Sequence, residues 1–221
     1  MPDKEENNPY LERTILSGLN HPGIPRFIED FEHDGVHYMV QEYIDGYPLS
    51  YYIVKGRRFT EEEAKDVLCQ LLEILAYLHE PGEKRSAVVH RDLRLSNLVW
   101  CEGKVYLIDF GLARYWNNEG ANLEEFSIKT DIRMSRRHPG TKTYAILRKD
   151  ISPRSDLFGA GVVGLDMFAN WIEDENLFRK PWQEILPASD SYKLFIERLL
   201  GPENRFKTAR DALEVFSQSV E

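Results

Sequence analysis

Apolar positions recur along the chain with two spacings, and these spacings predict where its helices and strands lie. Residues 9–19 carry apolar side chains at helical spacing and are followed by helix-stopping residues, Pro22 among them. Residues 24–31 and 36–43 are rich in β-branched and aromatic side chains, and residues 33–35 between them have the composition of a hairpin turn. The beginning of the chain is therefore expected to form one helix and a two-stranded hairpin.

The longest helix is expected after residue 60. Thr60 and Glu63 have the spacing of a capping box, in which each side chain satisfies a free backbone N–H group of the first helical turn. A wide apolar face follows before Pro81 stops the helix, and it consists of Val67, Leu68, Leu71, Leu72, Leu75 and Leu78. This helix must be buried on one side. A short helical segment is expected before it, near residues 49–53.

The second half of the chain is expected to be mainly helical. Short strands are expected at residues 87–89 and 98–108, the latter interrupted by a turn at residues 102–103. Helices are expected at residues 155–170, 191–200 and 208–217. The polar stretch at residues 117–139 is too long for a plain connection and predicts a functional or mobile loop. These patterns predict an α+β protein.

The net charge of −9 changes which partners we expect. An acidic chain has no general affinity for nucleic acid or anionic lipid, because both favour a basic surface. No run of about 18 apolar residues is present, and the polar, acidic first ten residues do not have the pattern of a signal peptide. We therefore expect a cytoplasmic protein that binds neither nucleic acid nor membranes.

Three oxygen-bearing side chains flank the short strands of the second half. Asp92 and Asn97 follow the first strand in VVHRDLRLSNLVW, and Asp109 follows the second in VYLIDFGLAR. Phosphoryl transfer from ATP needs a carboxylate that orients and deprotonates the acceptor hydroxyl, and oxygen ligands that hold magnesium against the phosphates. The three residues supply both kinds of group, so this chemistry is the leading hypothesis.

These two segments resemble the catalytic loop and the metal-binding motif of the eukaryotic-type (Hanks-type) serine/threonine protein kinases. The resemblance implies that Asp92 is the catalytic base and that Asn97 and Asp109 are ligands of Mg²⁺. Arg94 stands where the family has a lysine near the transferred phosphate, and a cation there favours a serine/threonine kinase over a tyrosine kinase. ATP and Mg²⁺ are the implied cofactors, and a protein is the implied substrate.

The resemblance extends over essentially the whole chain. YMVQEYIDG is similar to the segment whose backbone hydrogen-bonds adenine, which implies ATP contacts at Glu42 and Ile44, with Val99 also in the nucleotide site. SDLFGAGVVGL is similar to the central helix of the family's larger lobe, whose Asp156 is expected to hold the catalytic-loop backbone. A stack of Leu16, Phe27, His90 and Phe110 is expected to join the two lobes.

The implied fold is protein-kinase-like and α+β. Residues 1–44 are expected to form a partial N-lobe, one helix plus a β-hairpin with the hinge, and residues 45–221 a nearly complete, mainly helical C-lobe. Only eleven residues precede Glu12, so the glycine-rich loop and the strand lysine that pairs with this glutamate have no counterpart. Poor ATP affinity is therefore expected unless a partner chain supplies those strands or the natural protein starts upstream.

Further expectations concern the activation segment and the histidines. The resemblance implies that Arg91 can bind a phosphorylated Thr130, Ser135, Thr141 or Thr143. Arg148 stands where the family has a glutamate that pairs with the arginine at position 205, so two like charges would meet. His79 and the other histidines outside the HRD motif have no ligand spacing and are interpreted as ordinary surface or turn residues.

Three functions remain open at this point. The first is a serine/threonine protein kinase that transfers the γ-phosphoryl group of Mg-ATP to a protein hydroxyl. The second is a pseudokinase-type binding or regulatory module, favoured by the missing lysine. The third is a small-molecule phosphotransferase of the antibiotic-kinase type, which shares the two aspartates and the asparagine.

Overall fold

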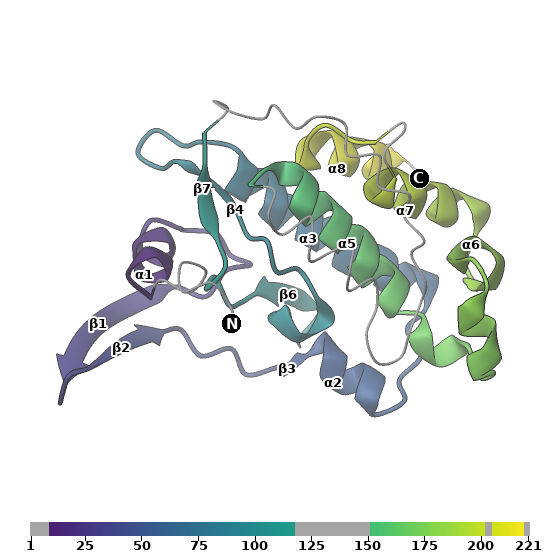
Figure 1. Cartoon of the computed structure of the whole chain (residues 1–221), viewed down its shortest axis with the longest axis horizontal. Helices are drawn as coiled ribbons and strands as arrows, with labels where there is room; N and C mark the ends of the chain where they lie inside the picture. Colours follow the sequence, from purple (N-terminus) through teal and green to yellow (C-terminus); the bar gives the residue numbers. More distant parts are fainter. Residues whose placement is uncertain (1–8, 118–150, 202–204, 219–221) are drawn as a thin grey trace.

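The computed structural model describes residues 9–117, 151–201 and 205–218 of the chain, and these residues have the expected α+β architecture. A hairpin and one helix lie at one end, two long helices side by side form the centre, and shorter helices lie at the other end (Figure 1). Among the described residues, no helix is both long and apolar enough to cross a membrane.

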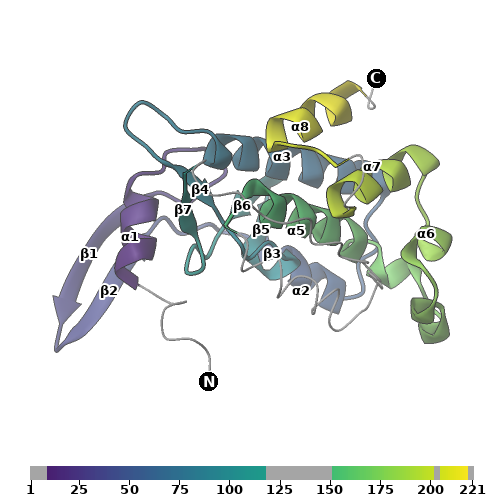
Figure 2. The ribbon, with the colours of Figure 1, turned by 45° about the horizontal axis from the view of Figure 1, so that its top comes forward.

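The first part of the chain is a helix packed on a two-stranded antiparallel sheet. It comprises α1 (Pro9–Ser17), β1 (Phe27–His33) and β2 (Val36–Gln41). The turn is tight because Asp34 and Gly35 both adopt positive φ angles, 51° and 74°, as a two-residue hairpin turn of this kind requires. Arg13 of α1 forms an ion pair with Asp30 of β1, with N and O 2.9 Å apart. The helix and hairpin therefore lie against each other, as Figure 2 shows.

The longest helix, α3 (Glu61–His79), begins with the expected capping box: Thr60 and Glu63 bond each other's backbone N–H groups. It is preceded by β3 (Tyr47–Pro48) and α2 (Leu49–Val54). The strands that follow α3 are β4 (Ala87–Val89), β5 (Leu98–Cys101), β6 (Lys104–Leu107) and β7 (Arg114–Trp116). β3, β5 and β6 form one antiparallel sheet in that order, and β4 pairs with β7.

Helix α5 (Pro153–Asp166) forms the centre of the helical part, and all its residues except Arg154 are buried. It packs between α3 and α7 (Asp190–Leu200), and α8 (Ala209–Gln218) covers α3. Two glycines allow the close approach of α7: a methyl group on Gly164 would lie 2.5 Å from Cδ1 of Ile196, and one on Gly161 2.7 Å from Leu200. The short helix α6 (Trp182–Ile185) precedes α7.

One glycine ties the first part of the chain to the second. The carbonyl oxygen of Gly23, between α1 and β1, accepts a 2.9 Å hydrogen bond from the backbone N–H of Leu107 in β6. A Cβ atom at Gly23 would lie 2.7 Å from Cδ1 of Ile74 in α3, so only glycine fits without displacement of that side chain.

The observed elements confirm most of the sequence-based expectations. The expected helices and hairpin occur within a few residues of the predicted bounds, and the strand expected at residues 98–108 is two strands joined at the predicted turn. Strands β3 and β7, helix α6 and the 3₁₀ turns Leu95–Asn97, Ala169–Trp171 and Glu175–Arg179 were not expected. The long loop expected at residues 117–139 lies outside the described residues after residue 117, and the boundary at residue 44 stays a prediction.

Candidate active site

The loop between β4 and β5 brings the first two predicted site residues into contact. Nδ2 of Asn97 donates hydrogen bonds to the backbone carbonyl oxygen of Asp92, at 2.9 Å, and to its carboxylate oxygen Oδ2, at 3.0 Å. Both residues are buried. The backbone N–H of Asn97 also donates to the carbonyl oxygen of Arg94, at 2.9 Å, which closes the 3₁₀ turn. The orientation of the Asp92 carboxylate is thus set from within its own loop.

Arg94 lies at the surface of the same site. Its Nη2 is 3.0 Å from Oδ2 of Asp92, and its side chain is 53% exposed while that of Asp92 is 5% exposed. An exposed ion pair of this kind contributes little to stability. It does place one positive charge beside the Asp92 carboxylate on the solvent side.

Asp109, the third predicted site residue, follows β6 and is held next to this loop. The backbone N–H of Ile108 donates to the carbonyl oxygen of Asn97, at 3.0 Å, and the Ile108 carbonyl accepts from Nε2 of His90, at 3.2 Å. Asp109 itself is exposed and has a φ angle of 65°, an unusual conformation for a residue other than glycine. Its exposed carboxylate is therefore available to a ligand.

The amide of Asn97 and the carboxylate of Asp109 fit a magnesium ion by the nature of their donors. Nδ2 of Asn97 donates to Asp92, and its Oδ1 accepts one 3.3 Å hydrogen bond from the Ser96 hydroxyl; an amide oxygen has two lone pairs, so Oδ1 can also accept a cation. No group of three or more His, Cys, Asp or Glu side chains with metal-binding geometry occurs in the described part of the chain. Mg²⁺ commonly takes one or two protein oxygens and completes its shell with phosphate and water oxygens, so two donors suffice.

His90 and Phe110 form the buried wall behind these groups. Their rings meet edge to face with centroids 4.8 Å apart, and both residues are fully buried. Burial lowers the pKa of His90, although the carboxylates of Asp156 and Asp92 act in the opposite direction. A neutral, buried imidazole that donates to a backbone carbonyl has a structural role. Leu16 is also buried in the core, and Phe27 is partly buried against it.

Asp156, in the first turn of α5, holds the backbone of the loop as expected. Its Oδ2 accepts the backbone N–H of His90, at 2.8 Å, and its Oδ1 accepts that of Arg91, at 2.7 Å. Arg91 has a φ angle of 68°, in the left-handed region. Such a conformation costs about 1–3 kcal/mol and persists only where surrounding contacts impose it. The two bonds to Asp156 are contacts of this kind.

The interpretation of His79 as a surface or turn residue was wrong. His79 is 5% exposed, and its Nε2 lies 2.9 Å from Oδ2 of Asp156. The missed signal is its position in α3: His79 continues the apolar stripe of Leu72, Leu75 and Ala76, so it faces the core.

The residues expected to contact adenine lie between β2 and β3. The backbone N–H of Glu42 donates to the carbonyl oxygen of Arg26, and the carbonyl oxygen of Ile44 accepts from Gly46. The remaining groups, the Glu42 carbonyl and the Ile44 N–H, have no hydrogen-bond partner in the part of the chain that the structure describes. Hydrogen bonds from the backbone and side chain of Arg26 lower the pKa of Glu42, whose carboxylate is turned to this arginine. Val99 is buried in β5.

Glu12 of α1 lies at the same site and has no basic partner among the residues that the structure describes. Its pKa is raised, first by burial and then by the negative charge of Asp109, while a hydrogen bond from the backbone N–H of Phe110 opposes the shift. Among residues 9–117, 151–201 and 205–218, no lysine or arginine forms an ion pair with Glu12. The carboxylate thus lies against the segment that carries Asp109, and no described residue neutralises its charge.

Several expectations concern residues outside the described part of the chain. The proposed phosphorylation positions Thr130, Ser135, Thr141 and Thr143 lie there, as does Arg148. Arg205 is described and is exposed, and Arg91 donates through Nη1 to the carbonyl oxygen of Leu112, at 3.1 Å. The phosphate-binding role of Arg91 stays a prediction.

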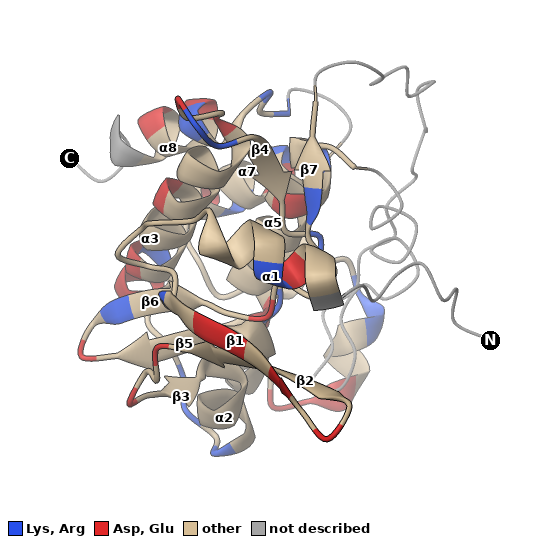
Figure 3. Cartoon of the chain, turned by 90° about the vertical axis from the view of Figure 1, so that its left-hand side faces the viewer, with Lys and Arg blue, Asp and Glu red and all other residues tan. Residues whose placement is uncertain are grey.

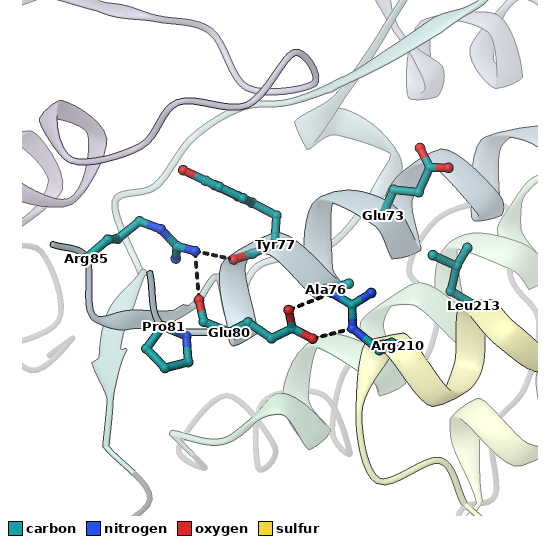
Figure 4. A pocket seen from close by; sticks show the side chains of 8 residues that line it. All are labelled: Glu73, Ala76, Tyr77, Glu80, Pro81, Arg85, Arg210 and Leu213. Carbon is teal, nitrogen blue, oxygen red and sulfur yellow. Dashed lines mark hydrogen bonds and ion pairs between the residues drawn. The ribbon is translucent and has the colours of Figure 1, made fainter. Parts of the chain in front are cut away.

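A surface pocket of about 310 Å³ lies away from these residues, between the end of α3 and α8 (Figure 4). Its charges are already paired: Arg210 makes two bonds to the carboxylate of Glu80, at 2.5 and 2.6 Å. Arg85 donates to the carbonyl oxygens of Tyr77 and Glu80, each at 2.7 Å, and so caps the end of α3. Because these groups satisfy one another, the pocket is not part of the candidate site.

Comparison with known proteins identifies the family to which this arrangement belongs. The family described as the protein kinase domain matches residues 1–206, which is most of the chain. The chain belongs to the protein kinase family. The kinase-like fold expected from the sequence is thereby confirmed.

Individual protein kinases from several organisms are similar to the chain. A probable serine/threonine-protein kinase, YbdM, of Bacillus subtilis is 26% identical over 220 residues, which are 99% of this chain and 74% of that protein. Serine/threonine-protein kinase B of Synechocystis is 27% identical over 88% of this chain and 35% of its own length. Calcium/calmodulin-dependent protein kinase type 1 of Caenorhabditis briggsae is 29% identical over 92% of this chain and 58% of its own length. The chain thus spans about a third to three quarters of these relatives.

Proposed function

We propose that the chain is a serine/threonine protein kinase that transfers the γ-phosphoryl group of Mg-ATP to a protein hydroxyl. The observation that carries this proposal is the hydrogen-bonded pair of Asp92 and Asn97 beside the exposed carboxylate of Asp109. Such a set can orient a hydroxyl and hold a divalent cation at the same place. The names of the similar kinases support a serine or threonine acceptor.

Each residue of the site has a definite part in this reaction. Asp92 accepts the proton of the substrate hydroxyl, and Asn97 holds its carboxylate in the orientation to do so. Arg94 balances the negative charge that gathers near Asp92 as the phosphoryl group arrives. Mg²⁺, held through Asn97 Oδ1 and Asp109, would neutralise phosphate charge when bound.

The nucleotide would be held by the segment between β2 and β3. The Glu42 carbonyl offers an acceptor and the Ile44 N–H a donor, and adenine presents complementary groups on one edge. Val99, buried in β5, would provide apolar contact to the ring. This assignment places adenine at the junction of the hairpin and the helical part.

Glu12 favours a second candidate, a binding or regulatory module without transfer activity. Its carboxylate has no basic partner in the described residues and lies near Asp109, so phosphate would meet two negative groups on that side. Loss of one directed positive charge typically lowers a rate by about 10² to 10³. Catalysis by the isolated chain is therefore expected to be weak.

We also propose that the outer edge of β2 accepts a strand from a partner chain that brings the missing positive charge. β2 pairs with β1 along one edge, and no described residue pairs with its other edge. Val36 and Tyr38 of β2 are 51% and 43% exposed, which offers an apolar surface to such a strand. Exposed acidic residues of the hairpin, Glu29, Glu32 and Asp34, favour a basic partner (Figure 3).

The decisive experiment measures nucleotide binding and phosphate transfer with matched variants. Wild-type protein, Asp92→Asn and Asp109→Asn are compared for stabilisation by Mg-ATP and for transfer from labelled ATP to a generic protein and to a small aminoglycoside. Asp92→Asn should bind Mg-ATP but transfer none, and Asp109→Asn should lose magnesium-dependent binding. Binding without transfer would favour the regulatory module, and transfer to the aminoglycoside alone the small-molecule phosphotransferase.

The partner strand can be tested in the same assay. A peptide of alternating apolar residues with one lysine is added, together with a control peptide in which alanine replaces the lysine. The lysine peptide should lower the Kd for Mg-ATP and the control should not. If neither peptide changes binding, β2 does not accept such a strand.

A further inference from the structure

The side-chain amide of Gln70, in the middle of α3, bonds the backbone of a neighbouring β-hairpin. Its Nε2 donates to the carbonyl oxygen of Gly103, at 2.9 Å, and its Oε1 accepts the backbone N–H of Val105, at 2.8 Å. Nε2 also donates to Oδ2 of Asp66, one turn earlier in α3, at 3.0 Å. Both amide hydrogens are therefore used, which fixes the orientation of the Gln70 side chain.

These bonds cover the outer edge of β6. This strand is the last in the sheet formed by β3, β5 and β6, and no described strand pairs with its outer edge. The amide of Gln70 takes the place of a neighbouring strand there, because it offers a donor to Gly103 and an acceptor to Val105. Val105 is 2% exposed, so without Gln70 its N–H group would be buried and unsatisfied.

The hairpin held in this way carries both proposed magnesium ligands. β5 and β6 are joined at Glu102 and Gly103, whose φ angles of 49° and 81° form a tight two-residue turn. Asn97 immediately precedes β5 and Asp109 lies two residues after β6, so both stand at the open end of the hairpin. At that end the backbone N–H of Ile108 donates to the carbonyl oxygen of Asn97, at 3.0 Å.

We propose that Gln70 is a positioning residue for the magnesium ligands: it fixes the β5–β6 hairpin against α3, and the hairpin in turn fixes the place of Asn97 and Asp109. The two bonds from Gln70 lie toward the turn, so it acts on these ligands through the paired strands. The magnesium part of this proposal rests on the proposed kinase function. The part that concerns the hairpin backbone does not.

Two substitutions of Gln70 remove its hydrogen bonds in steps. Gln70→Met keeps the length and approximate volume of the side chain and removes both bonds to the hairpin. Gln70→Glu keeps an oxygen that accepts the Val105 N–H but has no hydrogen for the Gly103 carbonyl at neutral pH. Glu73→Met, at an exposed position one turn later in α3, is the matched control.

Three quantities are measured for each protein. Hydrogen exchange of the Val105 amide reports the direct contact with Gln70. Exchange of the Ile108 amide, which bonds Asn97, reports what reaches the open end of the hairpin. The Kd for Mg²⁺ is obtained by titration in the presence of a non-hydrolysable ATP analogue, and binding of the analogue without magnesium is measured beside it.

Gln70→Met should speed exchange at both amides and raise the Kd for Mg²⁺ by up to about tenfold, with binding of the analogue without magnesium unchanged. Gln70→Glu should show the same changes to a smaller degree, and Glu73→Met none of them. If Gln70→Met does not fold, Gln70→Glu alone decides.

Faster exchange at Val105 alone would overturn the proposal, because the contact would then be local. An unchanged Kd for Mg²⁺ beside faster exchange at Ile108 would overturn it too, since the ligands would not depend on the hairpin. Wild-type protein that binds no Mg²⁺ would refute the proposed kinase function alone, because exchange at Ile108 still tests whether Gln70 holds the hairpin.

Discussion

Asn97 donates its side-chain N–H to the carboxylate of Asp92 while its oxygen faces the other way. One amide therefore serves two purposes in the proposed site: its nitrogen orients the base, and its oxygen, which accepts one hydrogen bond from Ser96, has a lone pair for a cation. An aspartate at this position would keep the oxygen ligand and lose the donor.

We expect Asn97→Asp to keep magnesium-dependent nucleotide binding but to lower kcat by about 10² to 10³, because a second carboxylate 3.0 Å from Oδ2 of Asp92 repels it. Single-turnover kinetics and nucleotide titration of the same protein check this. Asn97→Ala is the matched control and should lose both binding and turnover. Wild-type turnover in Asn97→Asp would mean that the amide nitrogen has no role.

We expect the positive charge of Arg94 to increase the rate of phosphate transfer but to contribute little to stability. We expect Arg94→Met to lower kcat by about 10², while Arg94→Lys, which keeps a cation without the forked geometry, stays within about tenfold of wild type. The free energy of unfolding of both variants should lie within about 1 kcal/mol of the wild-type value, because the Arg94 side chain of this ion pair is 53% exposed. Steady-state kinetics and urea unfolding test these values. Equal activity of the two variants would exclude a role for the charge.

We expect the negative charge of Glu12 to destabilise the folded state at neutral pH. Its pKa is raised by burial and by Asp109, so the folded state holds this proton more tightly than the unfolded chain does. Stability from this group therefore falls as the pH rises from the ordinary carboxyl pKa through the raised one.

Glu12→Gln keeps an oxygen that can accept the Phe110 N–H and removes the charge. It should raise the free energy of unfolding at pH 7, by less than about 1 kcal/mol because the group is only half buried. The gain should vanish at pH 4, which urea unfolding at the two pH values can show. A destabilised glutamine variant at pH 7 would indicate that a cation neutralises Glu12.

Gly164→Ala should separate α5 from α7. The added methyl group would lie 2.5 Å from Cδ1 of Ile196 and 3.0 Å from the hydroxyl of Tyr192, so we expect a loss of about 1–3 kcal/mol. Gly18→Ala is the control, because its Cβ would meet its nearest atom at 3.5 Å and should change stability by under about 1 kcal/mol. Thermal and urea unfolding measure both. Equal effects of the two substitutions would contradict this packing.

Helices were predictable wherever an apolar face repeats over several turns. The capping box at Thr60 and the stripe of α3 are local in sequence, so both the start and the buried side of this helix could be read directly. β3 and β7 have two and three residues, too few for any alternation, and they exist because β5 and β4 offer partners. Pairing between distant segments has no local signal.

The same limit applies to the candidate site. Asp92, Asn97 and Asp109 were found because they occur in two short motifs in a fixed order. The bond between Asp92 and Asn97, and the position of Glu12 beside Asp109 with no cation among the described residues, required the structure. His79 was missed because its partner Asp156 lies 77 residues further along the chain.

The contact at Gly23 limits how the protein can change shape. Gly23, which precedes the hairpin, is hydrogen-bonded to Leu107 of β6 and packs against α3 so closely that no side chain fits there. Leu107 lies two residues before Asp109. A translation of that segment would break the contact, whereas a rotation about it would not. Opening and closing above the proposed nucleotide site should therefore be a swing about Gly23, which would break the hydrogen bond between the Phe110 N–H and the Glu12 carboxylate and leave the backbone beside Asp109 in place.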